Sequence, residues 1–164
     1  MNSELLTLID QAAKNGLLTA DTPANLRSWL TRECFGQYRP RIAELIKAGE
    51  WQKLDAMFWT AIPFGTGGRR GPMGEMGPAT INDRTIAESA HGMSVYLRST
   101  GCTSGGSAVI AHDTRNYSAH FARITACVFA AHGLKVFLFD GHRSTPELSY
   151  AVRKLECNVG VVIS

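Results

Sequence analysis

The stretch that decides the fold is residues 108–163, AVIAHDTRNYSAHFARITACVFAAHGLKVFLFDGHRSTPELSYAVRKLECNVGVVI. Short apolar runs alternate in it with segments whose apolar residues recur at helical spacing: 108–111, 117–132, 136–139, 146–155 and 159–163. Apolar runs of this kind predict buried strands, and strands joined by helices predict right-handed βαβ crossovers. We therefore expect an α/β fold with three layers, α/β/α, in which helices cover both faces of a mixed, mostly parallel sheet.

The part of the chain before this domain is expected to be helical. Apolar residues recur there at helical spacing, and Gly16 follows the first such stretch as a stop signal. Asp21 and Pro23 form a start signal, because Asp can cap a helix and Pro fits its first turn. The predicted organisation is an N-terminal helical segment, residues 1–59, followed by an α/β domain, residues 60–164.

The composition is that of a folded domain, with 45% apolar and 19% charged residues in 164. A formal net charge of +3 is too small to indicate nucleic-acid binding. No apolar run reaches the roughly 18 residues of a membrane span, and residues 1–8 lack the basic residue typical of a signal peptide. We expect a cytoplasmic protein that binds neither nucleic acid nor membrane.

The cysteines are widely spaced and form no C-x-x-C pair: Cys34, Cys102, Cys127 and Cys157. This spacing argues against a zinc ribbon or a redox motif. We expect reduced and mostly buried thiols, and no metal site built from this chain.

A glycine- and arginine-rich stretch, residues 64–74 (FGTGGRRGPMG), is the first candidate for chemistry. Its glycines exclude a regular helix or strand and let backbone N–H groups approach an anion, while a guanidinium matches phosphate oxygens. The stretch does not fit the P-loop pattern and lacks the strand and glycine spacing of a dinucleotide site. By composition alone, a phosphate-binding loop and a flexible surface loop both remain open.

A second candidate lies where the predicted strands end, since ligands gather at the carboxyl ends of parallel strands. Residues 112–115 (HDTR) and 140–145 (DGHRST) follow the first two strands. Asp113 and Arg115 form either a structural ion pair or a ligand contact. Ser144, followed by Pro and Glu, is expected to be a helix N-cap.

Together these segments resemble the α-D-phosphohexomutase family of phosphoglucomutases and phosphomannomutases. Residues 64–71 (FGTGGRRG) look like the family's F-G-T-[AS]-G-x-R-G loop, and further matching segments follow in order: Asp83–Ile86, Ala111–Arg115, Ser118–Ala122, Gly133–Val136, Thr145–Arg153 and Gly160–Ser164. The match covers roughly residues 60–164, and an ordered set of motifs is far more specific than any one of them. The resemblance identifies residues 60–164 as domain I of this family.

The resemblance implies a mechanism. A phosphoserine in the family's A-S-H-N-P loop donates its phosphoryl group to a sugar phosphate, and the bisphosphorylated sugar turns over and returns the other phosphate. Mg²⁺ bound to the phosphoserine and to an aspartate loop of a later domain neutralises charge, and an activator of the glucose 1,6-bisphosphate type is implied. Such chemistry depends on positioning and charge stabilisation.

Carried over residue by residue, the resemblance places Arg70 on the family's loop arginine near the phosphoserine, as a catalytic residue. Thr66, Gly67 and Gly68 fall on the phosphate-binding positions beside it, although Gly67 replaces the commoner Ala or Ser. Arg69 stands where an apolar residue is common, and it either faces solvent or adds phosphate affinity. Ser164 matches the first position of the serine loop, whose nucleophile would lie two positions further on.

We expect the 164 residues to be a truncated N-terminal part of a mutase, inactive alone, whose partners are a phosphosugar and the remaining domains of the same polypeptide. The pattern leaves open whether the sugar is glucose, mannose, glucosamine or a pentose. The main alternative is a non-catalytic α/β module that binds phosphate or sugar phosphate, and a nucleotide-binding Rossmann-like domain is a weaker one.

Overall fold

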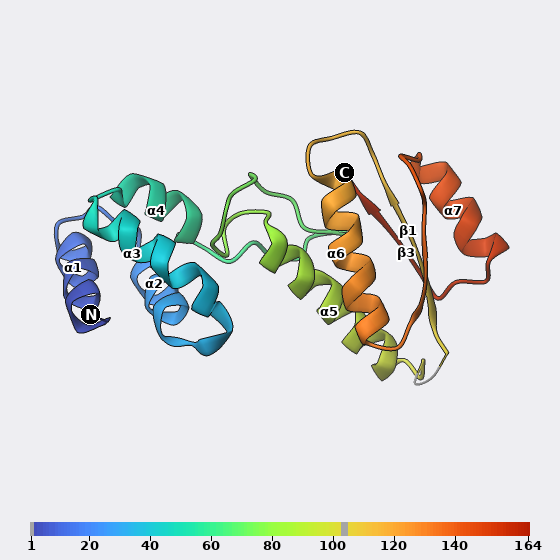
Figure 1. Cartoon of the computed structure of the whole chain (residues 1–164), viewed down its shortest axis with the longest axis horizontal. Coiled ribbons are helices and arrows are strands. Elements are labelled where there is room, and N and C mark those ends of the chain that lie inside the picture. Colours follow the sequence, from blue (N-terminus) through green and yellow to red (C-terminus); the bar gives the residue numbers. More distant parts are fainter. Residues whose placement is uncertain (1, 103–104) are drawn as a thin grey trace. The chain divides into compact units, whose positions relative to one another are not determined.

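The computed structural model describes residues 2–102 and 105–164 (Figure 1). Its helices and strands follow in the order α1 (Asn2–Lys14), α2 (Thr22–Thr31), the 3-10 helix η1 (Glu33–Tyr38), α3 (Arg39–Lys47), α4 (Trp51–Phe58), α5 (Asp83–Ser99), β1 (Ser107–His112), α6 (Ser118–Ala131), β2 (Lys135–Leu138), α7 (Thr145–Lys154) and β3 (Val159–Ile163). The chain divides into two compact units, residues 1–82 and 83–164. The predicted boundary between the helical segment and the α/β domain, at residues 59 and 60, is not the boundary between these compact units and stays a prediction.

The first unit is helical, as predicted, and its helices enclose one apolar core. Trp29 lies at the centre of this core, stacked on Phe35 at 4.3 Å between ring centroids and meeting Phe58 edge-on at 5.3 Å. The buried members of the core come from every helix and from the segment after α4: Leu5, Ile9, Leu26, Trp29, Leu30, Phe35, Ile42, Leu45, Ile46, Leu54, Met57, Phe58 and Met76. Burial of these side chains is the main stabilising term for this unit.

The start of α2 is where predicted, but its capping chemistry differs. Pro23 lies in the first turn, whereas the Asp21 side chain makes no capping hydrogen bond. Asp55 of α4 instead holds the residues that lead into the helix, because its Oδ1 accepts from the Thr22 hydroxyl at 2.5 Å and from the Thr19 N–H at 2.7 Å. Gly16 ends α1 with a φ of +70°, which confirms it as a stop.

The second unit contains a three-stranded sheet in the order β2-β1-β3, and both strand pairs are parallel. Figure 1 shows α5 and α6 on one face of the sheet and α7 on the other. Ala90, Ala108, Ile110, Ala122 and Phe129 form the core on the first face. On the other face, Val109 and Ala111 of β1 pack with Leu148 and Ala151 of α7. The expected three-layer α/β/α arrangement is confirmed, with a sheet that is parallel throughout the described strands.

The prediction of mostly buried cysteines is wrong. All four thiols are free, but Cys34 and Cys127 are exposed and Cys102 and Cys157 are half-buried. On α6 the buried positions are Ser118, Phe121, Ala122, Thr125 and Phe129, which lie along one face of the helix, and Cys127 falls outside that face. Within the described residues, no helix is both long and apolar enough to cross a membrane.

Candidate functional site

The glycine- and arginine-rich stretch is a loop held by backbone hydrogen bonds. Gly65 and Gly68 close a tight turn through Gly65 N–H to Gly68 O at 2.9 Å, with the reverse contact at 3.4 Å. Gly67 lies at its tip with a φ of +77°, a conformation that glycine adopts without strain. Thr66 and Gly67 are both exposed. The turn therefore presents backbone groups to solvent, as a loop that approaches an anion must do.

The segment that follows the loop anchors it to α4. The Ile81 N–H donates to the Pro72 carbonyl at 2.8 Å, and the Ala79 N–H donates to the Met57 carbonyl at 3.1 Å. A Cβ placed on Gly77 would lie 2.2 Å from the same Met57 oxygen, so the two backbones touch there. The loop is thereby fixed at its base, which limits the conformations of the residues it carries.

The two adjacent arginines of the loop differ in exposure. Arg70 is exposed and Arg69 is half-buried. An exposed guanidinium offers its planar fork of donors to an anion in solvent. Of the two arginines, Arg70 is therefore better placed to meet a phosphate group that approaches the loop, which is the position the family resemblance gives it.

Asp113 lies at the carboxyl end of β1 and organises a network of donors. It accepts from the Arg115 N–H at 2.9 Å and the Ser118 hydroxyl at 2.7 Å, and the Arg115 guanidinium lies 3.3 Å from its other oxygen. A side-chain hydrogen bond from Ser164 adds to these. Desolvation is the largest single influence and raises the pKa of Asp113, but the hydrogen bonds and the Arg115 charge together lower it. Asp113 and Arg115 were expected to form either a structural ion pair or a ligand contact, and the structure contains the ion pair.

The sheet order marks this end of β1 as a place for ligands. The chain passes from β1 to β2 on one side and then through α7 to β3 on the other side of β1. In open α/β sheets, ligands bind at the carboxyl ends of the strands where the winding reverses. Asp113 and Ser164, which follow β1 and β3, lie at that point.

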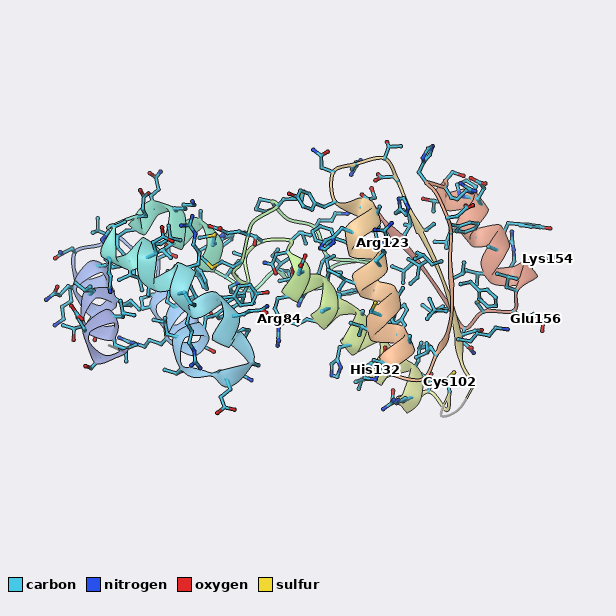
Figure 2. The ribbon with its side chains drawn as sticks, in the orientation of Figure 1. Arg84, Cys102, Arg123, His132, Lys154 and Glu156 are labelled. Carbon is cyan, nitrogen blue, oxygen red and sulfur yellow. The ribbon has the colours of Figure 1, made fainter. Side chains whose placement is uncertain are left out.

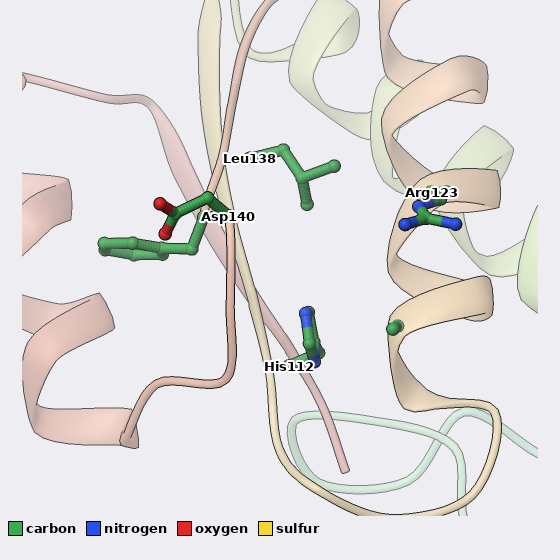
Figure 3. Close-up of a pocket in the computed structure, with 6 residues that line it drawn as sticks. His112, Arg123, Leu138 and Asp140 are labelled. Carbon is green, nitrogen blue, oxygen red and sulfur yellow. The ribbon is translucent and has the colours of Figure 1, made fainter.

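A small cavity lies beside it, between the ends of β1 and β2 and the first turns of α6 (Figure 3). It has a volume of about 160 Å³ and is lined by His112, Ala119, Arg123, Leu138, Phe139 and Asp140. The Nδ1 of His112 is 3.0 Å from the Asp113 carbonyl oxygen, which orients the ring. The strand-end rule predicted His112 and Asp140 here, but it gave no sign of Arg123 from α6, which only the folded packing brings to this edge.

The loop after β2 has a structural role. Arg143 pairs with Asp140 at 3.1 Å and lies 5.4 Å from the ring centre of Phe139. Ser144 and Glu147 form a reciprocal capping box at the start of α7, which confirms the predicted N-cap. The backbone hydrogen bond from Ser144 is the largest cause of the lowered pKa of Glu147. These contacts account for Asp140, Arg143 and Ser144 without a ligand.

The structure groups the site residues proposed from sequence by unit. Thr66, Gly67, Gly68 and Arg70 lie together on the anchored loop of the first unit. Ser164 lies in the second unit, exposed and directly after β3. Among the described residues there is no group of three or more His, Cys, Asp or Glu side chains that could hold a metal ion.

The second unit is an α/β/α domain, and a glycine- and arginine-rich loop precedes it in the chain. The family model described as phosphoglucomutase/phosphomannomutase, alpha/beta/alpha domain I, matches residues 61–164. The chain belongs to this family.

Proteins similar to this chain are named phosphoglucomutase. A Staphylococcus epidermidis phosphoglucomutase is 42% identical over 105 residues, which cover 64% of this chain and 19% of that protein. Phosphoglucomutases of Staphylococcus haemolyticus and Staphylococcus aureus are 39% and 40% identical over 107 residues, covering 65% of this chain and 19% of each relative. The chain thus spans about a fifth of the length of these relatives. No solved structure gives a significant match.

Proposed function

We propose that this chain is the N-terminal part of a phosphohexomutase that moves a phosphoryl group within sugar phosphates of the glucose 1-phosphate/glucose 6-phosphate type. The observation that carries the proposal is the family match over residues 61–164, which includes the arginine loop and the strand β3 that ends just before Ser164. The proposed route uses a phosphoserine and a bisphosphorylated sugar. Residues 60–164 act as domain I, and the parent protein works in the cytoplasm.

Arg70 is proposed to contact the phosphoryl group during transfer. Its guanidinium is exposed on a loop whose base is held by backbone hydrogen bonds, so little order has to be imposed when an anion binds. A fixed cation beside a transferring phosphoryl group stabilises the charge that develops there. Thr66, Gly67 and Gly68 are proposed to offer backbone and hydroxyl donors to the same group.

Ser164 is proposed to begin the loop that carries the nucleophilic serine, two positions further along the parent polypeptide. The hydrogen bond between Ser164 and Asp113 supports this role, because it ties the start of that loop to the anchored end of β1. The 164 residues alone then lack the nucleophile, and they are proposed to have no mutase activity.

The family implies Mg²⁺ and an activator of the glucose 1,6-bisphosphate type. No group of three or more His, Cys, Asp or Glu side chains that could hold a metal ion lies among the described residues. We propose that the ion is held by the phosphoserine and by an aspartate loop in a later domain, so no step on this chain is assigned to it. The proposed partners are a phosphosugar and the remaining domains of the same polypeptide.

The test is a coupled assay for conversion of glucose 1-phosphate to glucose 6-phosphate. The parent polypeptide should be active, the 164-residue chain inactive, and Arg70→Ala in the parent should lower kcat/KM by at least about a hundredfold. The matched control is Lys47→Ala, which removes an exposed positive charge from the same unit and should leave the rate unchanged. Activity in the 164-residue chain would contradict the proposal that the nucleophilic serine lies outside these residues. A parent that binds sugar phosphate without turnover would support a non-catalytic binding module instead.

A further inference from the structure

The cavity at the carboxyl ends of β1 and β2 has nitrogen-bearing side chains on two of its walls. His112 is the last residue of β1, Arg123 lies in the second turn of α6, and both line the cavity. Figure 2 labels Arg123 on α6, and Figure 3 shows the His112 ring extending into the space between β1 and that helix. We propose that this cavity binds a phosphate group, carried either by free phosphate or by a phosphosugar. The proposal goes beyond the mutase reaction, because it uses none of the residues assigned to phosphoryl transfer.

The Arg123 guanidinium is available to an anion. The residue is exposed, and among residues 2–102 and 105–164 no carboxylate pairs with it. Asp140 is the acidic residue among those that line the cavity, and its Oδ1 already accepts from Arg143 at 3.1 Å. Figure 3 shows the Asp140 carboxylate directed away from Arg123. Arg123 therefore keeps its planar fork of donors, which matches two oxygens of one phosphate group.

The backbone contact of His112 decides which of its ring nitrogens carries a proton. Its Nδ1 lies 3.0 Å from the Asp113 carbonyl oxygen, which can only accept, so Nδ1 is the protonated nitrogen. In the neutral ring Nε2 is then an acceptor, and it can take a hydrogen bond from the P–O–H group of a hydrogen phosphate. In the protonated ring Nε2 is a donor to a phosphate oxygen. His112 therefore suits phosphate with or without a proton, whereas sulfate has no proton to offer a neutral ring.

The cavity has the size and the partly apolar walls that suit such a ligand. A single water needs roughly 10–15 Å³ of this kind of volume, so about 160 Å³ admits a phosphate group together with water. Leu138, Phe139 and Ala119 line the rest of the cavity and keep part of the solvent away from the ligand. Opposite charges attract more strongly where water is excluded. Arg123 should therefore hold an anion here more tightly than an arginine on an open surface would.

The test is an NMR titration of the 164-residue chain with inorganic phosphate near pH 7.5, read at the His112 ring and the Leu138 methyl groups. These signals report on the cavity, so phosphate that binds the arginine loop is not counted. We expect saturable shifts at both residues, and Arg123→Gln should weaken the binding by at least about tenfold. Arg123→Lys keeps the charge but not the fork, so its affinity should lie between those of Arg123→Gln and the unchanged chain. Tighter binding of glucose 6-phosphate than of phosphate would assign the site to a phosphosugar, and the reverse order would assign it to free phosphate.

Two matched controls separate a specific site from general attraction of anions. Arg153 is an exposed arginine on α7, which covers the other face of the sheet, so Arg153→Gln should leave the phosphate affinity unchanged. Sulfate resembles hydrogen phosphate in charge and shape but has no proton, and near pH 7.5 an ordinary imidazole is mostly neutral. Sulfate should therefore bind about fivefold more weakly, the value of one hydrogen bond. The absence of a saturable shift at His112, the same affinity in Arg123→Gln and Arg153→Gln, or equal binding of sulfate and phosphate would overturn the proposal.

Discussion

Gly77→Ala should destabilise the first unit by at least about 3 kcal/mol. Gly77 has a φ of +94°, where a Cβ costs about 1–2 kcal/mol. The added Cβ would also lie 2.2 Å from the Met57 carbonyl oxygen, a backbone atom that cannot rotate away. To relieve that contact, the backbones at Gly77 and Met57 must move apart, which also weakens the hydrogen bond from the Ala79 N–H to the Met57 carbonyl. The displacement and the weakened hydrogen bond each cost about 1 kcal/mol more.

Two other glycines of the same unit separate these contributions. Gly16 also has a positive φ, of +70°, but nothing lies within 4 Å of an added Cβ, so Gly16→Ala should cost only about 1–2 kcal/mol. Gly36 has neither a positive φ nor a close neighbour. Gly36→Ala should therefore be neutral or stabilise by up to about 1 kcal/mol, because it restricts the unfolded chain.

The assay is urea unfolding followed by tryptophan fluorescence. All three tryptophans, Trp29, Trp51 and Trp59, lie in the first unit, so the signal reports the unit that contains the changes. From most to least stable, the expected order of the variants is Gly36→Ala, Gly16→Ala and Gly77→Ala. If Gly77→Ala cost no more than Gly16→Ala, the backbone contact that anchors the arginine loop would not exist as described.

Two further predictions concern polar groups. Ser144→Ala should lower the free energy of unfolding of the second unit by about 1 kcal/mol, because it removes the capping box with Glu147, and amide exchange in the first turn of α7 should rise; unchanged exchange would argue against the cap. Desolvation is the largest influence on the pKa of Asp55 and raises it, but hydrogen bonds from Thr22 and Thr19 lower it overall below 3.8. The ionised Asp55 carboxylate therefore stabilises the folded unit fully above its ordinary pKa, and this stabilisation is lost as the pH falls through the lower pKa of the folded state. The free energy of unfolding of the first unit should consequently fall less steeply with acid in Asp55→Asn than in the unchanged chain.

The sequence predicted the elements whose signals are local. The strand at 159–163 has the predicted limits, and the predicted N-cap at Ser144 is encoded within a few residues. A mostly parallel sheet was expected from the alternation of apolar runs and helical segments, because strands joined by helices favour crossover connections, and both observed strand pairs are parallel. Residues close in the chain determine these features, and their pattern is visible without the fold.

Features that depend on distant residues could not be predicted in this way. Asp21 has the right type for a cap but makes no capping hydrogen bond, whereas Asp55, 33 positions from Thr22 in the chain, accepts from the Thr22 hydroxyl. Arg123 reaches the cavity at the strand ends only because α6 packs there. The site loop itself was found from sequence, because its glycines and arginines carry a recognisable family pattern.

The most direct test of the proposed mutase is the location of a phosphoryl group on the parent polypeptide. After incubation with glucose 1,6-bisphosphate, the intact mass should rise by one phosphoryl group, and peptide mapping should place it on a serine two positions after Ser164. A parent that gains no phosphoryl group, or gains it elsewhere, would contradict the account.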